Sequence, residues 1–267
     1  MKETKFPTIP AHCPLSTLRN NHRPKEISAM TKLLAFDLDG TLTQHKTPID
    51  EVNAEVLKRL SERYTLLMIG AGVCDRIFKQ LREFPIDIIG NYGMQYAKYN
   101  SETKSLDLVR NDGRVCENRD EIEEKAWYIR KKYGFCDFVG DNMEYHPSGC
   151  LTLPLLGTRA IQQDKLAFDP DRKKRRAFYG EVCELISYYN VFDGGSSSFD
   201  MAPKPFDKYY ALDLYLREKG LSHSEAAFVG DDYGLGGNDE SVYKSDIKFV
   251  TIDDYRTFPK IMEGYLG

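Results

Sequence analysis

A short apolar run that ends in two aspartates constrains this 267-residue chain more than any other feature. Residues 33–36 (LLAF) are apolar, and Asp37 and Asp39 follow them directly. An apolar run of this length, bounded by charge and glycine, predicts a buried strand of a parallel sheet. Ligands bind at the carboxyl ends of such strands, where the chain turns away and leaves a crevice. We therefore expect the functional site at Asp37 and Asp39.

The chemistry of this segment favours a divalent cation. Side chains two residues apart in an extended chain point to the same side, so the two carboxylates repel each other unless a cation or a proton lies between them. Mg²⁺ is the expected cation, because it prefers oxygen ligands. Gly40 lets the backbone turn, and Thr41 and Thr43 offer amides and hydroxyls to an anion. The alternative is an ordinary acidic turn after a strand.

Strand and helix patterns alternate on both sides of a central block. Strands are expected at 65–69, 86–89, 226–229 and 247–250, and helices from Asp50 onward, at 75–84, at 206–219, at 238–243 and at the end of the chain. Val52 is among the residues expected on the inner face of the first helix. This alternation predicts right-handed crossovers and an α/β fold with a parallel sheet of five strands.

The alternation stops within the central block. Its patterns predict a hairpin across 100–102, an amphipathic helix at 117–133, strand-like pieces at 135–139, 143–146, 151–156, 191–193 and 198–201, and one long helix beginning at Asp169-Pro170. We therefore expect an inserted α+β cap domain at 101–202 and a core made of 31–100 and 203–267. Residues 1–30 show no periodicity and are expected to form a flexible N-terminal extension.

Composition restricts the partners of the chain. Hydrophobic residues make up 41% and charged residues 29%, which is typical of a soluble globular protein. A net charge of −4 argues against a nucleic-acid partner, and the basic run 172–176 is expected to be a solvated helix face. No apolar run has the length of a membrane span, so no membrane partner is expected. Six scattered cysteines without a C-x-x-C pair indicate reduced thiols and a cytoplasmic protein.

A second strand ends in acids near the C-terminus. The run 226–229 (AAFV) leads through Gly230 into Asp231 and Asp232. If its strand lies beside the first one, Asp231 completes a metal site with Asp37 and Asp39, the latter through its backbone carbonyl. Asp232, Asn238 and Asp239 are candidates for positions just outside the direct ligands. A plain acidic surface loop is the alternative, whereas the glycine spacing does not fit a dinucleotide loop.

The complete string Asp37-x-Asp39-Gly40-Thr41-Leu42-Thr43 resembles the first motif of the haloacid dehalogenase (HAD) superfamily. This resemblance implies a Rossmann-like core in which Asp37 is the nucleophile that accepts a phosphoryl group and Asp39 is the general acid and base. Lys208, at the start of a helix, matches the lysine of the third motif and is expected to bind phosphate. Gly40 and Thr41 are further phosphate-binding candidates. Gly72 is another, because Ala71 stands where most members have a hydroxyl residue in the second motif and the Gly72 amide could replace that hydroxyl.

Further features are the missing hydroxyl of the second motif, the run Gly236-Gly237-Asn238-Asp239, and Ser198-Phe199-Asp200 followed by Asp207-Lys208. With them the chain resembles, over about residues 32 to 265, eukaryotic-type phosphomannomutases, which carry an α/β cap. The resemblance implies that Ser198 and Asp200 contact a sugar. Arginines that hold a second phosphate in those mutases are replaced here by Lys46, His146, Thr158 and Lys165, with Arg159 one residue away from such a position. Lysine lacks the bidentate fork of arginine, which weakens the grip on a bisphosphate and favours hydrolysis.

The leading expectation is therefore a Mg²⁺-dependent phosphatase that acts on a small phosphorylated metabolite, most plausibly a sugar phosphate, through an aspartyl phosphate. One alternative is a phosphomannomutase or phosphoglucomutase. Another is a catalytically silent protein that binds sugar phosphates, although a retired site has no reason to keep both acids. The sequence leaves the particular sugar and the oligomeric state open.

Overall fold

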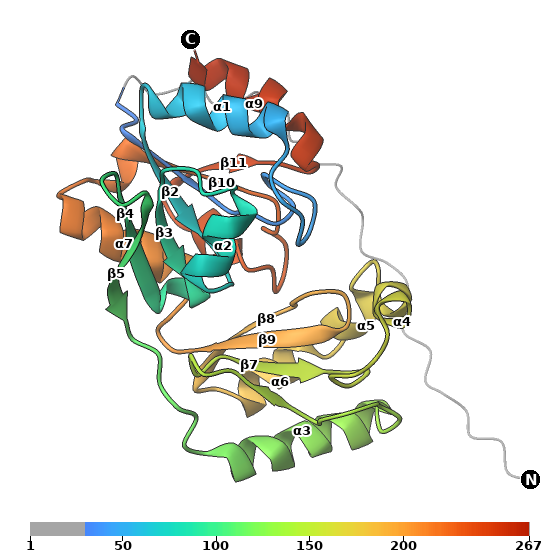
Figure 1. The fold of residues 1–267 in the computed structure, drawn as a ribbon. Coiled ribbons are helices and arrows are strands. Elements are labelled where there is room, and N and C mark those ends of the chain that lie inside the picture. Colours follow the sequence, from blue (N-terminus) through green and yellow to red (C-terminus); the bar gives the residue numbers. More distant parts are fainter. Residues whose placement is uncertain (1–29, 267) are drawn as a thin grey trace, which may run out of the picture.

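The computed structural model describes residues 30–266. The predicted N-terminal extension therefore lies, apart from Met30, outside the described residues, as does Cys13. Two units are stacked on each other, each built around its own β-sheet (Figure 1). We call the unit with the larger sheet the core, and the unit that spans residues 119–203 the cap.

Seven strands form the core sheet. Their order is β11 (Lys248–Thr251), β10 (Ala226–Gly230), β1 (Leu33–Phe36), β2 (Thr65–Ile69), β3 (Asp87–Gly90), β4 (Gln95–Asn100) and β5 (Ser105–Asn111). The first five of these are parallel, and β4 and β5 run antiparallel at one edge. β1 lies between β2 and β10. The chain runs from β1 to β2 on one side and from β10 to β11 on the other, so the connections that leave the carboxyl ends of β1 and β10 diverge. A crevice for a ligand opens at this point in sheets of this type.

Helices cover both faces of the core sheet, which explains its unbroken apolar runs. One face packs against α1 (Glu51–Ser61), α2 (Cys74–Gln80) and α9 (Phe258–Leu266), and the other against α7 (Lys208–Lys219) and α8 (Glu240–Tyr243). Alternate residues of β1 serve the two faces, and all four are fully buried. Three short 3₁₀ helices complete the core, η1 (Asn91–Gly93), η2 (His223–Glu225) and η3 (Tyr255–Thr257).

The cap sheet is antiparallel and has four strands. Their order is β6 (Glu144–Tyr145), β7 (Leu151–Pro154), β9 (Ser198–Pro203) and β8 (Tyr189–Phe192). One face packs against α3 (Arg119–Tyr133) and α6 (Tyr179–Leu185), and α4 (Gln162–Phe168) and α5 (Lys173–Arg176) lie at one end. Phe199 and Met201 point into this packing. Because side chains alternate along a strand, Asp200 lies on the opposite face, which is turned toward the core in Figure 1.

Most predicted elements are present, and four expectations are wrong. The hairpin β4–β5 extends the core sheet, so the sheet has seven strands rather than five and residues 105–111 lie with the core rather than the insertion. Residues 135–139 form no strand. Val52 is 62% exposed rather than inward-facing. The long helix predicted after Asp169 is split into α5 and α6 at Phe178, whose φ of −130° is not helical. The buried Asp169 carboxylate accepts hydrogen bonds from the backbone amides of Lys174 and Arg175 at the start of α5.

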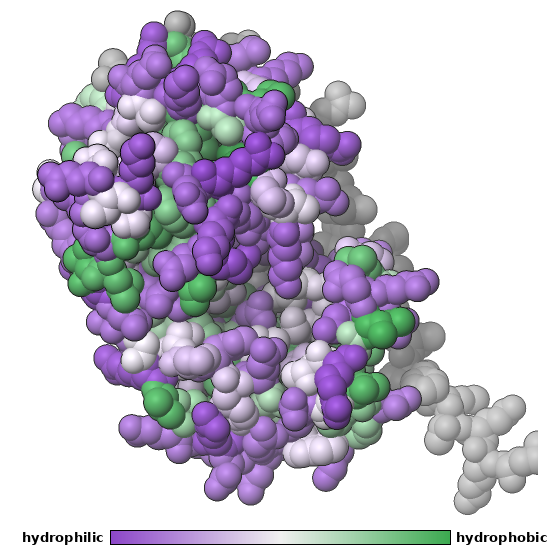
Figure 2. All heavy atoms as spheres, in the orientation of Figure 1, coloured by the Kyte–Doolittle hydropathy of each residue, from purple (hydrophilic) through white to green (hydrophobic). Residues whose placement is uncertain are grey.

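The outer surface adds few constraints. On the face shown in Figure 2, hydrophilic side chains predominate and the hydrophobic ones form small scattered groups. None of the helices between residues 30 and 266 is long and apolar enough to cross a bilayer. The five cysteines in the described part of the chain are free thiols, as expected.

Candidate active site

The carboxyl ends of β1 and β10 bring three carboxylates together. The backbone amide of Asp37 donates to the Val229 carbonyl at 2.9 Å, which aligns the two strand ends. Carboxylate oxygens of Asp37, Asp231 and Asp239 all lie within 4.8 Å of one another. Asp37 is 5% exposed and Asp239 is fully buried. The structure therefore gathers the acid cluster that the two strand ends predict, with Asp239 in addition.

One lysine faces this cluster. Asp207 caps the start of α7 and accepts a hydrogen bond from the Tyr210 amide, which places Lys208 in the first turn. The fully buried Lys208 ammonium lies 2.6 Å from Asp37 Oδ1, 2.7 Å from Asp239 Oδ1 and 2.7 Å from Asn238 Oδ1. Three carboxylates face a single buried ammonium, so the ionised cluster carries an excess of two negative charges.

Burial and mutual repulsion alter the acidities in the cluster. Burial raises the pKa of Asp37 well above its ordinary value, and the carboxylates of Asp239 and Asp231 add to the rise. Burial and the Asp239 charge likewise raise the pKa of Asp231 to about 6. Burial alone would lower the pKa of the Lys208 ammonium, but the Asp239 and Asp37 carboxylates raise it above its ordinary value. The lysine therefore stays charged.

The donor set fits a hard divalent cation. All three candidate ligand groups are carboxylates, which suit Mg²⁺ better than a softer metal. The sequence expectation named Asp37, Asp39 and Asp231 as ligands and placed Asp239 outside them, whereas the structure groups the Asp239 side chain with Asp37 and Asp231. Asp239 Oδ2 also accepts hydrogen bonds from the amides of Asp231 and Asp232, so it shapes the loop that carries the cluster.

Asp39 is held apart from this cluster by its own partners. Its Oδ1 accepts hydrogen bonds from the Lys46 amide at 2.7 Å and from Gln80 Nε2 at 2.6 Å. Arg76 lies 3.6 Å from Oδ2 and also bonds Gln80. The sequence analysis missed Arg76 and Gln80. A signal that could have identified them is their four-residue spacing, which places both on one face of a helix that starts beside the second strand end.

The phosphate-binding candidates have distinct environments. The Gly40 amide is already bonded to the Thr43 carbonyl, and a Cβ at Gly40, where φ is +98°, would lie 2.3 Å from Asp231 Oδ2. Thr41 Oγ1 donates to Asp231 Oδ1 at 2.8 Å. Among residues 30–266 the Thr41 amide has no hydrogen-bond acceptor, so it remains a donor for an anion. Gly72 leaves room for the Arg76 guanidinium, since a Cβ there would lie 2.2 Å from it.

Polar groups of the cap sheet face the core. Thr152 and Asp200 are paired across β7 and β9, and Thr152 Oγ1 donates to Asp200 Oδ1 at 2.9 Å. His146 Nε2 lies 3.1 Å from the same hydroxyl, and Ser198 Oγ donates to the Gly194 carbonyl. Burial raises the pKa of Asp200, an effect that Thr152, His146 and the core residue Lys46 counteract. The predicted residues Lys46, His146 and Asp200 thus lie in one electrostatic neighbourhood.

Two predicted cap residues, Arg159 and Lys165, lie outside this neighbourhood. Arg159 is exposed, and its side chain forms no hydrogen bond within residues 30–266. Lys165 donates to the Thr158 carbonyl at 3.3 Å, and Thr158 bonds Asp141. No contact within the described chain links either cation to the acid cluster.

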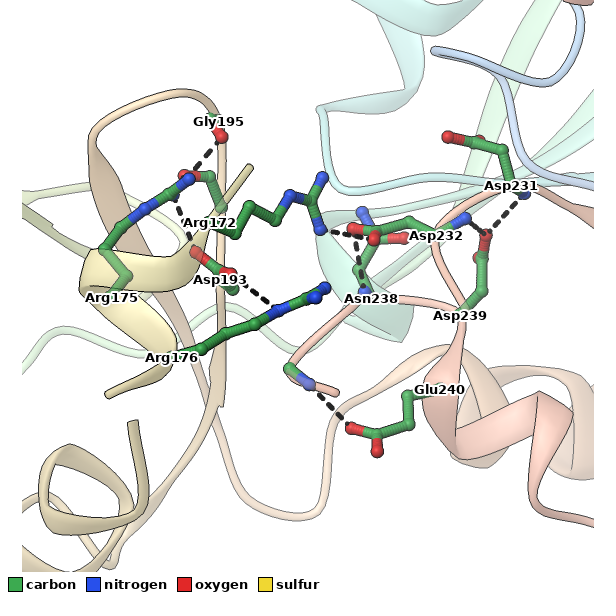
Figure 3. Close-up of polar contacts among 12 residues, drawn as sticks. Arg172, Arg175, Arg176, Asp193, Gly195, Asp231, Asp232, Asn238, Asp239 and Glu240 are labelled. Carbon is green, nitrogen blue, oxygen red and sulfur yellow. Dashed lines mark hydrogen bonds and ion pairs between the residues drawn. The ribbon is translucent and has the colours of Figure 1, made fainter. Parts of the chain in front are cut away.

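The basic run 172–176 differs from its prediction as a solvated helix face. Arg175 is fully buried and lies 3.0 Å from Asp169 and 2.7 Å from Asp193, and it also bonds backbone carbonyls of the β8–β9 loop. Arg172 crosses to the core and donates to Asp232 Oδ1 at 2.5 Å. Figure 3 shows Arg172 and Arg176 extending from the cap toward the loop that carries Asp231 and Asp239. Asp232 therefore turns toward the cap and away from the acid cluster.

Known proteins resemble this chain in sequence and fold. A family model described as eukaryotic phosphomannomutase matches residues 139–257. The phosphomannomutase of Triticum aestivum is 26% identical over 230 residues, which cover 80% of this chain and 86% of the wheat protein. That of Nicotiana benthamiana is 27% identical, with coverages of 87% and 93%. The structure of C-terminally truncated Plasmodium falciparum IMP-nucleotidase aligns with a TM-score of 0.63 at 15% identity, covering 89% of this chain and 72% of that one.

Proposed function

We propose that the chain is a phosphoryl-transfer enzyme with a HAD-type core and cap, and more specifically a Mg²⁺-dependent phosphatase that acts on a small phosphorylated metabolite, a sugar phosphate in particular. The observation that carries the proposal is the charge balance of the acid cluster. Within residues 30–266, Lys208 is the cation that forms ion pairs with the cluster of Asp37, Asp231 and Asp239, so two negative charges remain in excess when all three carboxylates are ionised. One divalent cation neutralises that excess, and a buried charge excess is otherwise costly.

In the proposed reaction Asp37 is the nucleophile. Lys208 holds its Oδ1, and the other carboxylate oxygen has no hydrogen-bond donor among residues 30–266. Attack on the substrate phosphorus forms a bond from Asp37 to phosphorus while the ester bond to the leaving oxygen breaks. Lys208 and the free Thr41 amide stabilise the negative charge on the phosphoryl oxygens.

Asp39 supplies and then removes a proton. Gln80 and the Lys46 amide fix its carboxylate beside the cluster but outside it. The protonated carboxyl group gives its proton to the departing alcohol, and the resulting carboxylate takes a proton from the water that attacks the aspartyl phosphate. Inorganic phosphate leaves, and Asp37 is restored.

Asp37, Asp231 and Asp239 are the residues that would hold Mg²⁺, together with the Asp39 carbonyl predicted from the sequence. When bound, Mg²⁺ supplies positive charge that offsets the repulsion between these carboxylates and an incoming phosphate. The cap face with Asp200, Thr152 and Ser198 would bind the hydroxyl groups of the substrate. Lys46, His146, Arg159 and Lys165 remain candidates for contacts to its anionic parts.

Two cap arginines, Arg172 and Arg175, favour hydrolysis over phosphoryl relocation. Arg175 is enclosed by acids and carbonyls, and Arg172 is paired with Asp232. Neither arginine can bind a second phosphate unless its acidic partner is displaced. A mutase has to hold a bisphosphate while it turns over in the site, whereas a phosphatase only has to admit water.

A mutase is the second candidate, and the sequence comparisons favour it. The relatives found by sequence carry the name phosphomannomutase and align along most of their length. In that case the phosphoryl group on Asp37 would pass to another hydroxyl of a hexose phosphate rather than to water.

The proposed function is tested with a panel of phosphorylated sugars. Purified protein is assayed for phosphate release with Mg²⁺ and with EDTA, alongside Asp37→Asn and the control Asp213→Asn on the surface of α7. We expect Mg²⁺-dependent release that falls by about a thousand-fold in Asp37→Asn, because the nucleophile is lost, and that is retained in the control. Full activity of Asp37→Asn, or activity in EDTA, would refute the proposal.

A further inference from the structure

Tyr92 occupies an unusual backbone position beside the acid cluster. It lies in η1, which follows the carboxyl end of β3, and its amide donates to the Gly70 carbonyl of the neighbouring strand end. Its φ is +56°, and that of Asn91 is +48°. An aromatic residue rarely adopts this left-handed conformation, and residues held in it are concentrated at functional sites.

The aromatic ring joins the core to the cap. Tyr92 is 4% exposed, and its ring stacks on Phe192 of β8 with centroids 4.4 Å apart and planes 6° from parallel. Both rings belong to a hydrophobic cluster that includes Cys150 and Ala202 of the cap and Met94 and Phe206 of the core. Ala71, where the second motif lacks its hydroxyl residue, packs against this cluster. The side chain is thus fixed in direction by contacts from both units.

The hydroxyl group at the end of this fixed ring has no partner. It forms no hydrogen bond with any residue between Met30 and Leu266, and it is not among the fully buried polar atoms that lack a partner, so the oxygen is open to solvent although the ring is buried. Burial raises its pKa, and Asp200 of the cap, Asp232 and Asp37 add to the rise. The buried amide nitrogen of the neighbouring Asn91 side chain is unpaired as well. An unpaired donor therefore lies at the boundary between the core and the cap.

We propose that Tyr92 is a specificity-determining residue whose hydroxyl hydrogen-bonds a hydroxyl group of the substrate, between the phosphoryl group at Asp37 and the cap residue Asp200. The inference rests on the proposed function and narrows its substrate class to phosphomonoesters of polyhydroxylated compounds. A site built to bond a substrate hydroxyl discriminates strongly against analogues that lack it. Tyr92 thereby selects the substrate on the core side, as Asp200 does on the cap side.

The test compares two substrates in Tyr92→Phe, which keeps the stacked ring and removes only the hydroxyl. The kcat/KM for a hexose 6-phosphate is divided by that for p-nitrophenyl phosphate, which has no hydroxyl on its leaving group. We expect this ratio to fall about ten-fold, as for one lost hydrogen bond of about 1.4 kcal/mol. Tyr64→Phe is the matched control, because the Tyr64 hydroxyl bonds the Tyr265 carbonyl away from the site and its loss should leave the ratio unchanged.

Phe192→Leu tests the contribution of the ring stack separately from that of the Tyr92 hydroxyl. Losing the stack loosens the direction of Tyr92, so the same ratio should fall partway while circular dichroism shows a folded protein. A ratio in Tyr92→Phe equal to that of the wild type would overturn the inference.

The proposed function and the inference fail in different ways. If the wild type releases no phosphate from any ester, the proposed function is wrong, and the inference is then tested by calorimetric titration with hexose 6-phosphate and with inorganic phosphate. Tyr92→Phe should weaken binding of the sugar ester more than that of inorganic phosphate. Equal weakening of both, or no binding of the sugar ester to the wild type, would overturn the inference.

Discussion

The acid cluster of the core (Asp37, Asp231 and Asp239) and the arginine cluster of the cap (Arg172, Arg175 and Arg176) differ in how their buried charges are balanced. In the core, three carboxylates face one ammonium, that of Lys208. In the cap, the guanidinium of Arg175 lies between Asp169 and Asp193, and its Nη1 donates to the backbone carbonyls of Gly194 and Ser198. Burial raises the pKa of Asp193, although three arginines counteract the rise.

We infer from this difference that the core cluster binds ligands, whereas the cap cluster stabilises a loop. The core cluster has an excess of charge and a free donor, so it is complete only with a cation and an anionic substrate. The cap cluster has its charges paired and fixes a loop, with Arg172 reaching out to Asp232. Excess charge at the ends of parallel strands, rather than burial of charge alone, therefore marks the reactive site.

Removing the buried cation from each cluster gives the largest effect. Lys208→Met and Arg175→Met should each cost about 3–5 kcal/mol, because carboxylates are left buried and unpaired. Thermal melts with and without Mg²⁺ distinguish the two. Mg²⁺ should raise the Tm of Lys208→Met by more than that of the wild type, since the divalent cation now faces a larger excess of negative charge. An equal rise in Tm on adding Mg²⁺ to Lys208→Met and to Arg175→Met would contradict the difference between the two clusters.

Adding a methyl group beside Asp231 tests the core cluster alone. A Cβ at Gly40 would lie 2.3 Å from the Asp231 carboxylate, whereas at Gly134, where φ is also positive, a Cβ meets nothing within 4 Å. Both Gly→Ala changes carry a backbone cost of about 1 kcal/mol. Only Gly40→Ala should raise the Mg²⁺ concentration for half-maximal activity, by about ten-fold. A similar rise in Gly134→Ala would show that backbone strain, not displacement of Asp231, is responsible.

The contact between the two clusters should have a smaller effect. Arg172→Ala removes a partly exposed ion pair, so the free energy of unfolding should change by no more than about 1 kcal/mol. Hydrogen exchange of the amides in residues 231–239 should nevertheless become faster, because Asp232 loses its partner in the cap. Lys173→Ala, which loses an ion pair only with Asp171, is the control. Unchanged exchange in Arg172→Ala would show that the pair does not restrain the loop.

An exposed charge cluster gives the smallest effect. His223 lies 2.6 Å from Asp246 and 3.0 Å from Asp213, and burial is outweighed by these carboxylates, which raise its pKa. Its stabilising contribution is therefore complete below the ordinary histidine pKa of about 6.5 and is lost as pH rises through the raised folded value. His223→Gln should lower Tm by about 2 °C or less at pH 6 and by less than that at pH 9. A larger loss at pH 9 would contradict this assignment.

The sequence predicted the proximity of Asp37 and Asp231 because its signals are local. Apolar runs followed by Asp37 and Asp231 identify strand ends, and the parallel alternation places them side by side. The position of Asp239 depends on how its loop folds back, which spacing does not specify. The same reasoning was less successful in the cap, because Arg175 is buried against Asp193, which lies just after β8, and the run of five cations is by itself typical of a solvated face. Tyr92 was overlooked, since its backbone conformation and its stack on Phe192 have no pattern in sequence.

The hairpin β4–β5 shows the same limit. Its alternation predicts two paired strands, but the sheet they join is decided by tertiary packing at the edge of β3.

The most direct test of the central claim is the fate of the phosphoryl group. Hexose 1-phosphate is incubated with the enzyme, Mg²⁺ and a catalytic amount of hexose 1,6-bisphosphate, and the products are followed by ³¹P nuclear magnetic resonance. A phosphatase gives inorganic phosphate in an amount equal to the hexose 1-phosphate consumed. Accumulation of hexose 6-phosphate in place of inorganic phosphate would contradict the account and identify a mutase.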